Sequence, residues 1–510
     1  MCSLWNRLKF FLKSDYIWWT LISLGVIFRL QQYIANRSLW HDEANLALNI
    51  INRTFAELLQ PLDYDQGAPI GFLLITKTFT LLFGNEDYIL RLIPILSGLL
   101  ATYLAYRLAK EYLGVGGYLF LLIFATSWSL VYYASDLKQY ASDVMAVVLL
   151  IYLAFRSLGE DAKKKDIIML AVVGFFLIWI SHPGAFVAAG IGLVLALEKF
   201  LKKSYTRLSW MLGMGVVWIV SFGSTYLISL RSLAADESLK HYWRNAFMPI
   251  PPWKDWGWFI KTYTSLLQST SWGLDSEKLL WLSTALIIIG VISYFFKDWY
   301  KALIIIVPVS IVSLASAMQI YPIRGRLALF LIPIIILLLA EGAGRIYIFI
   351  NQWNHNAAII TYFALVLFIA WTPVNGAIDN FLSPRLGAHI KPVLTYVSEN
   401  RNEDDIVYIY HGARPSFNYY APFYGLEGES IITGLDLGNT QALTQFYKHV
   451  NNKLNGHSRV WVIFSHIVDC GGCEGDMETF YVEYLNQYGS IEEQYNVEGA
   501  SVYRYDFSAP

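Results

Sequence analysis

Residues 16–44 read YIWWTLISLGVIFRLQQYIANRSLWHDEA, an apolar run followed by a polar stretch that ends in two adjacent acids. A membrane-spanning helix needs roughly 20 predominantly apolar residues, and the run from Tyr16 to Tyr33 approaches that length. The preceding segment, 1–13, carries three basic residues, and no small-residue cleavage site is evident. Because basic flanks favour the cytosolic side, we expect an uncleaved first span with its N-terminus in the cytosol.

The composition extends this prediction to the whole chain. Of 510 residues, 56% are hydrophobic, 16% aromatic and only 15% charged, which is typical of a polytopic membrane protein and argues against nucleic acid as a partner. The net charge of -1 conceals an asymmetry, since lysine and arginine collect in some inter-span loops while acids and tryptophans collect in the alternate loops. Such an asymmetry indicates the topology.

The hydropathy pattern predicts about eleven spans. They cover approximately 16–34, 92–109, 117–134, 140–156, 167–181, 185–199, 209–230, 279–296, 302–318, 327–346 and 357–373. Most inter-span lysines can be cytosolic only if the apolar run 69–83, about 22 Å long as a helix, does not cross the bilayer. We therefore expect 69–83 to form a juxtamembrane helix on the outer interface, begun by Pro69 and ended by Gly84. An odd number of spans puts the C-terminus outside.

The chain becomes mixed and polar beyond about residue 378. Short aromatic and β-branched stretches predict strands, and two longer stretches predict helices; the strands are 407–410, 460–464 and 502–505, the helices 389–399 and 440–454. The predicted fold is thus a polytopic α-helical membrane domain over 1–377, with outer juxtamembrane helices, and a small C-terminal α/β domain over 378–510 on the outer face.

Three cysteines are too few for a disulfide framework. Cys470 and Cys473 form a Cys-Gly-Gly-Cys pair in the region predicted to be exported. A small-loop disulfide, two free thiols and part of a metal site all stay open for this pair.

The adjacent acids Asp42 and Glu43 are the strongest functional signal. Two neighbouring carboxylates at a bilayer surface are costly to desolvate together, so the pair indicates chemistry, and the alternative is a solvated loop or helix N-cap. The topology gathers further charged residues on the same outer side, at loops and span ends: Asp63, Asp65, Asp136, Lys138, Asp143, His182, Arg324 and Arg326. Acids and cations recurring there are what a lipid-phosphate site needs, whereas the alternative is incidental loop polarity.

Several motifs carry a resemblance to a known family. They are Trp-x-Asp-Glu-Ala at 40–44, Asp-Gln-Gly-Ala-Pro at 65–69 and Leu-Phe-Gly-x-x-x-Tyr-x-x-Arg-Leu-Ile-Pro at 82–94. Together they resemble the glycosyltransferase C superfamily, in the branch of protein O-mannosyltransferases and lipid A aminoarabinose transferases. The resemblance is clearest over 39–114, weaker at 132–140 and 324–333, and hardly touches the C-terminal tail. Members of this family take a sugar from a polyprenyl phosphate on the outer side of the membrane.

By this resemblance, Asp42 is the catalytic base or the carboxylate that orients the acceptor. An acceptor hydroxyl needs help to lose its proton as the new bond forms, and a placed carboxylate contributes roughly 10² to 10⁴ in rate. Direct attack of this kind inverts the anomeric configuration. Glu43 is implied as the partner of Asp42: it binds a metal, holds the acceptor, or acts on Asp42 by like-charge repulsion.

The leaving lipid phosphate gains negative charge, so the site needs cations or donors at that oxygen. Arg324 and Arg326 are the first candidates and Lys138 the next; the alternative is headgroup contact or interfacial snorkelling. Several relatives carry His or Lys in the juxtamembrane segment where this chain has Gln66. One expected phosphate cation is therefore absent, which leaves the identity of the donor open.

Four further residues, Asp136, Asp143, Asp65 and His182, are candidates for contact with substrate or metal. Asp136 or Asp143 together with Asp42 could bind Mg²⁺ or Mn²⁺, although no spacing demands it and no cofactor is certain. His182 contacts donor or acceptor, or is a turn histidine bonded to backbone. The outer loop 231–278 is rich in tryptophan, which predicts either an interfacial belt or a lid that excludes water.

The sequence thus favours an integral membrane glycosyltransferase that moves a sugar from a polyprenyl-phosphate donor to an acceptor hydroxyl of a glycan, lipid or protein outside. The alternatives are a flippase or transporter of lipid-linked sugars and a ligase or polymerase using a lipid-diphosphate oligosaccharide. Transporters usually bury acids near the bilayer midplane and often show a duplicated half, neither of which is visible. Short loops make a bacterial inner membrane the expected location.

Overall fold

The structure is a computed structural model that describes residues 15–160, 162–268, 277–435, 449–450, 453–454, 457–469 and 475–507. The chain divides into two compact units. The membrane unit comprises Met1–Ile34 and Arg53–Pro384, and the C-terminal unit comprises Ala35–Asn52 and Arg385–Pro510. The break follows residue 384 instead of the predicted 377. In addition, 35–52, which the sequence assigns to the membrane domain, groups with the C-terminal residues.

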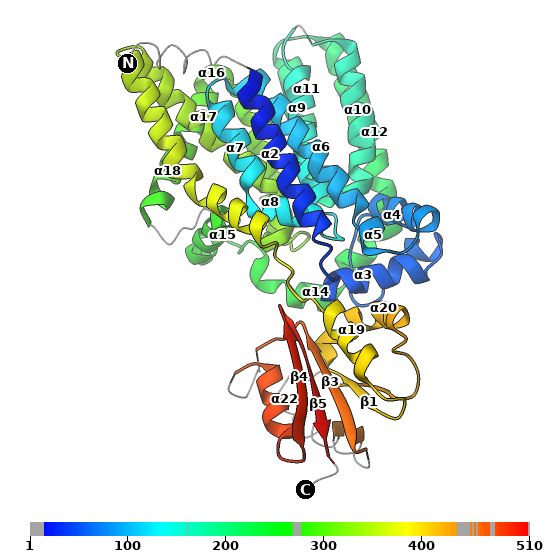
Figure 1. Cartoon of the computed structure of the whole chain (residues 1–510). Coiled ribbons are helices and arrows are strands. Elements are labelled where there is room, and N and C mark those ends of the chain that lie inside the picture. The colour runs from blue at the N-terminus through cyan, green and yellow to red at the C-terminus, as the bar shows by residue number, and fades with distance from the viewer. Residues whose placement is uncertain are drawn as a thin grey trace. The chain divides into compact units, whose positions relative to one another are not determined.

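Helices lying side by side, all of them long except α8, build the membrane unit (Figure 1). They are α2 (Asp15–Ile34), α6 (Leu92–Leu108), α7 (Gly116–Thr126), α8 (Trp128–Tyr132), α9 (Tyr140–Ser157), α10 (Lys164–Ile180), α11 (His182–Leu201), α12 (Tyr205–Thr225), α16 (Glu277–Ala317), α17 (Ile332–Asn351) and α18 (His355–Leu382). Each predicted span falls on one or two of these helices. α16 covers two predicted spans, and its backbone leaves the helical region at Asp298 between them.

Within the described residues, seven helices are long and apolar enough to cross a membrane, or eight if the bent pair of α7 with the helix that follows it counts as one span. That pair bends by 56°. α2 and α10 occupy two further predicted spans. The prediction of a multi-pass helical membrane protein is confirmed.

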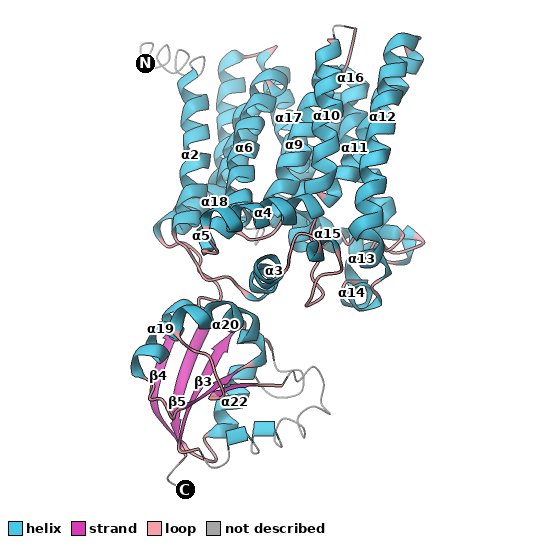
Figure 2. Ribbon diagram, turned by 90° about the vertical axis from the view of Figure 1, so that its right-hand side faces the viewer, coloured by secondary structure: helices cyan, strands magenta, loops and turns pink. Residues whose placement is uncertain are grey.

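Short helices gather at one end of the bundle, the end away from the start of α2 (Figure 2). They are η1 (Glu57–Leu59), α4 (Ile70–Phe83), α5 (Asp87–Leu90), α13 (Arg231–Ala235), α14 (Glu237–Tyr242) and α15 (Trp256–Gln268), and the turns η2 (Ala109–Leu113), η3 (Tyr133–Ser135), η4 (Tyr226–Leu230), η5 (Arg244–Ala246), η6 (Pro252–Lys254) and η7 (Gly325–Leu331) complete the unit. α4 is the predicted short helix: Pro69 is its N-cap, and Gly84, at φ 98°, ends it.

The bundle packs most tightly where α16 meets α17. A Cβ atom on Gly290 would collide with the carbonyl oxygen of Leu338, and one on Gly342 would collide with that of Leu286. Small residues let helix backbones approach closely in a membrane, where packing and hydrogen bonding replace the hydrophobic effect as the driving force. α17 follows η7 directly. The contact with α16 therefore fixes the helix that comes after the loop with Arg324 and Arg326.

The C-terminal unit contains a five-stranded sheet in the order β2-β1-β3-β5-β4. Its strands are β1 (Ile406–Ile409), β2 (Ile431–Thr433), β3 (Arg459–Ser465), β4 (Ser490–Val497) and β5 (Ala500–Asp506). β1 runs parallel to β2 and β3, while β5 runs antiparallel to β3 and β4. The three predicted strands lie in β1, β3 and β5, whereas β2 and β4 were not predicted.

The remaining elements of this unit are helices: α3 (His41–Asn52), α19 (Lys391–Asn400), η8 (His411–Ala413), α20 (Arg414–Tyr420), η9 (Ala421–Tyr424) and α22 (Met477–Leu485). Aromatic side chains, among them Tyr408, Phe464 and Tyr481, form a buried core against one face of the sheet. α19 confirms the predicted helix at 389–399. Most of the predicted helix at 440–454, and both Cys470 and Cys473, lie outside the described residues.

Candidate active site

Asp42 lies in the first turn of α3. The amide of Ala44 donates to the carbonyl of Trp40 at 2.9 Å, which makes Trp40 the N-cap of the helix. The carboxylate of Glu43 accepts from the amide of Trp40 at 3.3 Å, the reciprocal half of a capping box. The N-terminal turn of a helix favours negative charge, so the half-buried carboxylate of Asp42 lies where an anion is stabilised.

Glu43 is held from a second direction by Arg37. Their side chains form an ion pair of 2.7 Å and are 0% and 1% exposed. Such a buried pair is strongly destabilising to break, because a single buried charge is left behind. The bonds to Arg37 and to the Trp40 amide make Glu43 an anchor of the turn that carries Asp42.

Other contacts tie this segment to the rest of the C-terminal unit. Ser38 lies 3.1 Å from Nδ1 of His389, and the ammonium of Lys391 donates to the carbonyl of Asn36 at 2.7 Å. Nδ1 of His41 lies 3.2 Å from the carbonyl of Gly412. These bonds are the physical reason why 35–52 groups with residues 385–510. Local sequence patterns do not reveal these hydrogen bonds, since the partners are hundreds of residues apart.

In the membrane unit, the turn before α9 brings Lys138 against Gln66. Nζ of Lys138 donates to Oε1 of Gln66 at 2.5 Å, and Nε2 of Gln66 donates to the carbonyl of Tyr64 at 3.1 Å. The two bonds use both ends of the Gln66 amide and fix its orientation. Lys138 is buried, and its amide donates to the carbonyl of Asp136 at 2.6 Å in a tight turn. Gln66 thus binds a cation that comes from elsewhere in the sequence.

Arg326 reaches the same turn from the other end of the sequence. Its guanidinium carbon lies 6.0 Å from the centroid of the Tyr140 ring, which follows the Lys138 turn directly. Gly325, at φ 51°, makes the bend before it, and the hydroxyl of Tyr321 donates to the carbonyl of Leu327 at 2.9 Å. The structure therefore places Arg326 beside the segment that carries Asp136 and Lys138, while Arg324 is exposed.

Asp143 lies one turn into α9 and is buried. Its side chain lies near that of Ser181, and Ser181 accepts from the amide of Gly184 at 3.0 Å as the N-cap of α11. His182 is the first residue of that helix. Asp143 and His182 are therefore neighbours, as the predicted outer end of two spans requires.

The two acids before α4 are exposed. Asp63 forms an ion pair of 2.8 Å with Arg53, and Asp65 has a left-handed φ of 51°. Asp65 stays a predicted contact residue by its place next to Gln66.

The described part of loop 231–278 contacts both the segment before α4 and the segment before η7. Leu233 packs closely on Gly67, so that a Cβ there would lie 2.9 Å from it. The amide of Ile323 donates to the carbonyl of Ala246 at 2.9 Å. Trp253 and Trp256 remain 70% and 67% exposed, which suits a belt or a lid alike. Trp272 lies outside the described residues.

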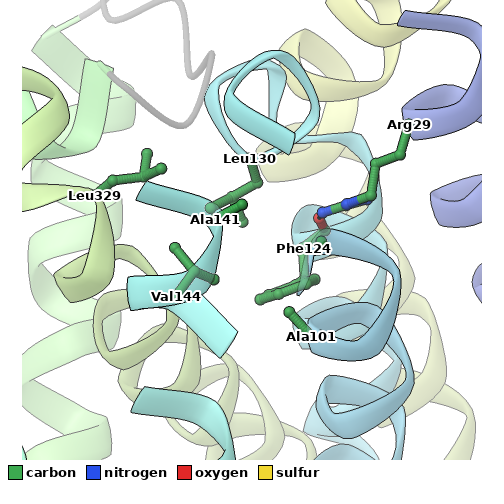
Figure 3. A pocket seen from close by; sticks show the side chains of 8 residues that line it. Arg29, Ala101, Phe124, Leu130, Ala141, Val144 and Leu329 are labelled. Atoms are coloured by element: carbon green, nitrogen blue, oxygen red, sulfur yellow. The ribbon is translucent and has the colours of Figure 1, made fainter. Parts of the chain in front are cut away.

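Sequence analysis overlooked Arg29, an arginine within the apolar run of the first span. It is 1% exposed, and its guanidinium donates to the carbonyls of Phe124 at 3.1 Å and Gly25 at 3.0 Å. Figure 3 shows it at the edge of a small, mostly apolar cavity, together with Leu130 and Ala141. The carbonyls at the C-terminal end of α7 attract a cation. Arg29 thus secures the bend that leads into the Lys138 turn.

Metal binding stays a prediction. Across the described residues, no three His, Cys, Asp or Glu side chains are arranged to hold an ion. Asp136, Asp143 and Asp42 remain the candidates named from the sequence, and an ion completed by substrate oxygens would need fewer protein ligands.

Comparison with known proteins supports the assignment of the fold. Residues 67–226 match a family model described as dolichyl-phosphate-mannose-protein mannosyltransferase. No curated protein matches the chain. Among solved structures, ArnT from Cupriavidus metallidurans in the apo state is 13% identical with a TM-score of 0.52, covering 96% of this chain and 98% of that one.

Two further solved structures agree. The same ArnT bound to undecaprenyl phosphate gives a TM-score of 0.53 at 13% identity, over 96% of this chain and 98% of that one. The apo oligosaccharyltransferase from Archaeoglobus fulgidus gives 0.50 at 11% identity, over 88% of this chain and 70% of that one. The chain thus shares the fold of these structures. The family match at residues 67–226 and this shared fold bear out the resemblance read from the sequence.

Proposed function

We propose that the protein transfers a sugar from a polyprenyl-phosphate donor to an acceptor hydroxyl, with Asp42 as the base. The family match at residues 67–226 supports a sugar transferase. The ArnT structure with undecaprenyl phosphate supports a polyprenyl-phosphate donor. The chain aligns with nearly the full length of that protein.

One observation carries the donor half of the proposal: Arg326, far away in sequence, contacts the ring of Tyr140, two residues after the buried Lys138. As the glycosidic bond breaks, the phosphate oxygen takes up negative charge, and ammonium and guanidinium groups stabilise that charge in a site of low dielectric. A flippase has no need for cations that act on a developing charge.

In this proposal, Asp42 acts on the acceptor. Its carboxylate takes the proton of the attacking hydroxyl while the oxygen bonds to the anomeric carbon and the lipid phosphate departs, so that the configuration inverts. Glu43 is a positioning residue in this proposal, because Arg37 and the Trp40 amide already engage it. The acceptor is the hydroxyl of a glycan, a lipid or a protein.

The proposed location is the bacterial inner membrane, with the site on the outer side. α2 begins directly after a basic segment, which favours the cytosolic side. The short helices α4, α5, α13, α14 and α15 lie at the opposite end of the bundle. Lys138 donates to Gln66, which lies shortly before α4, and this supports an extracytoplasmic site.

The test is discharge of a panel of sugar-charged polyprenyl phosphates by the purified full-length protein, with and without EDTA, followed by the release of free lipid phosphate. We expect one donor to be discharged in the presence of an acceptor, and Asp42→Asn to lower that rate at least about a hundredfold. Glu57→Gln, in an exposed turn, serves as the control variant.

Two outcomes would end the proposal. A wild-type protein that discharges no donor on the panel but moves the lipid between leaflets is a flippase. An Asp42→Asn variant with near-normal turnover removes Asp42 as the base. Loss of activity with EDTA, recovered with Mg²⁺ or Mn²⁺, would support the metal prediction.

A further inference from the structure

Two side chains hydrogen-bond the backbone of Leu39, three residues before Asp42. The Leu39 amide donates to the hydroxyl of Tyr420 at 2.8 Å, and its carbonyl accepts from the hydroxyl of Ser416 at 2.8 Å. Leu39 itself is 0% exposed. Both polar groups of its backbone are therefore satisfied by two side chains from the C-terminal residues of the chain.

The spacing of these two side chains explains how they can do this. Ser416 and Tyr420 are four residues apart on α20, so they lie on one face of the helix, one turn apart. One presents a donor to the carbonyl and the other an acceptor to the amide of the same residue. Such a match requires the chain at 39 to run in one direction and one register against α20.

Tyr420 is itself fixed. The ammonium of Lys391 lies 5.8 Å from the centroid of its ring, and the same ammonium donates to the carbonyl of Asn36. The amide of Lys391 also donates to the hydroxyl of Ser38 at 3.0 Å. α19 and α20 together therefore hold residues 36–39 from two sides. The ion pair between Arg37 and Glu43 joins the residues before Leu39 to the first turn of α3.

Resting on the proposed role of Asp42, we infer that the C-terminal domain is part of the catalytic apparatus, with Tyr420 and Ser416 as positioning residues that hold the Asp42 turn. They touch neither donor nor acceptor. Their effect passes through the backbone of Leu39 to a carboxylate three residues later. A misplacement of the order of 1 Å at a reacting group can cost about a hundredfold in rate, so even a partly loosened turn is measurable.

The test uses full-length enzyme carrying Tyr420→Phe and Ser416→Ala together. We expect kcat to fall about tenfold, with the KM for the lipid donor unchanged, because the donor cations belong to the membrane unit. Ser416→Thr restores the hydroxyl, so the Tyr420→Phe/Ser416→Thr variant should recover part of the loss. Combined with Asp42→Asn, the double variant should add no further loss, since both act on one group.

A second measurement does not depend on activity. Amide hydrogen exchange of the peptide covering Leu39 should become faster in the double variant, since the hydroxyl that accepts from this amide is removed. Matched controls remove the same groups elsewhere in the domain. Tyr505→Phe loses a hydroxyl that donates to Asn486 at 3.2 Å, and Ser398→Ala loses one that donates to Thr395 at 2.9 Å.

Each result decides the matter. If the double variant turns over at the wild-type rate, or if the two controls lose as much kcat as it does, Tyr420 and Ser416 are not positioning residues. A further tenfold loss on top of Asp42→Asn would also overturn the inference. If Asp42→Asn itself keeps normal turnover, the proposed function fails instead. The exchange result then tests only whether Tyr420 and Ser416 hold the backbone of Leu39.

Discussion

Glu43 and Asp143 are both buried carboxylates, and the protein treats them in opposite ways. Glu43 has Arg37 at 2.7 Å and the Trp40 amide at 3.3 Å. Asp143 lies within a membrane span next to the Ser181 hydroxyl, and its Oδ1 atom has no hydrogen-bond partner among the described residues. A carboxylate with a dedicated cation is built for structure. One that leaves a buried oxygen unsatisfied is the better candidate for contact with substrate.

The largest effect should come from breaking the Glu43 anchor. Arg37→Met leaves the buried Glu43 carboxylate without its ion-pair partner, and we expect the C-terminal unit to lose about 3–5 kcal/mol of unfolding free energy. Pulse proteolysis of the full-length protein in increasing urea measures this loss.

Arg504→Met is the matched control for Arg37. Arg504 pairs with Glu492 at 2.9 Å and Glu493 at 2.7 Å, where the acids are partly exposed, so its loss should cost less than about 1 kcal/mol. Equal losses for the two variants would mean that the Arg37 pair is no more important than a surface pair.

The cations of the membrane unit should give an intermediate effect. Arg326→Gln removes a guanidinium from beside Tyr140, and we expect kcat/KM for the lipid donor to fall at least about tenfold, which corresponds to about 1.4 kcal/mol. The KM for the acceptor should stay constant. Arg207→Gln, in the first turn of α12 at the other end of the bundle, is the control; a donor dependence that is the same in both variants removes Arg326 from the site.

The smallest effect on stability should come from Asp143. An amide costs less free energy to bury than a carboxylate. Asp143→Asn should therefore leave the free energy of unfolding within about 1 kcal/mol of the wild type, with a thermal midpoint that is unchanged or slightly higher. Donor discharge should nevertheless fall. A drop in stability as large as that of Arg37→Met would show that Asp143 is an anchor too. Ser142→Ala, on the same helix as Asp143, loses a 3.0 Å contact with Ser97 of α6 and controls for local packing.

Much of the fold was predictable because its signals are local. Hydropathy runs located the spans, and Pro69 and Gly84 marked the ends of α4. β4 escaped because Ser490–Val497 is a largely exposed edge strand rich in polar residues, and β2 because it has only three residues. Both lie at the edges of the sheet, where burial imposes little pattern on the sequence.

The site was predictable only in its parts. The residue types of Asp42, Lys138 and Arg326 were visible, but their neighbours were not, because Gln66 and Tyr420 look like ordinary polar and aromatic residues. Long-range hydrogen bonds leave no periodicity in one sequence. Arg29 did leave a signal, since a cation within an apolar run of about 20 residues is rare and needs an explanation.

The division of the C-terminal unit into two segments distant in the chain has a consequence for biosynthesis. Residues 35–52 emerge from the ribosome long before 385–510, and their contacts form only after the last helices have been inserted. The nascent protein therefore passes through most of its synthesis with the Asp42 turn unassembled. A chain that stops short of residue 385 would carry Lys138 and Arg326 yet lack Ser416 and Tyr420, which bond the Leu39 backbone. Under the proposed function, such a chain would not hold its base in place.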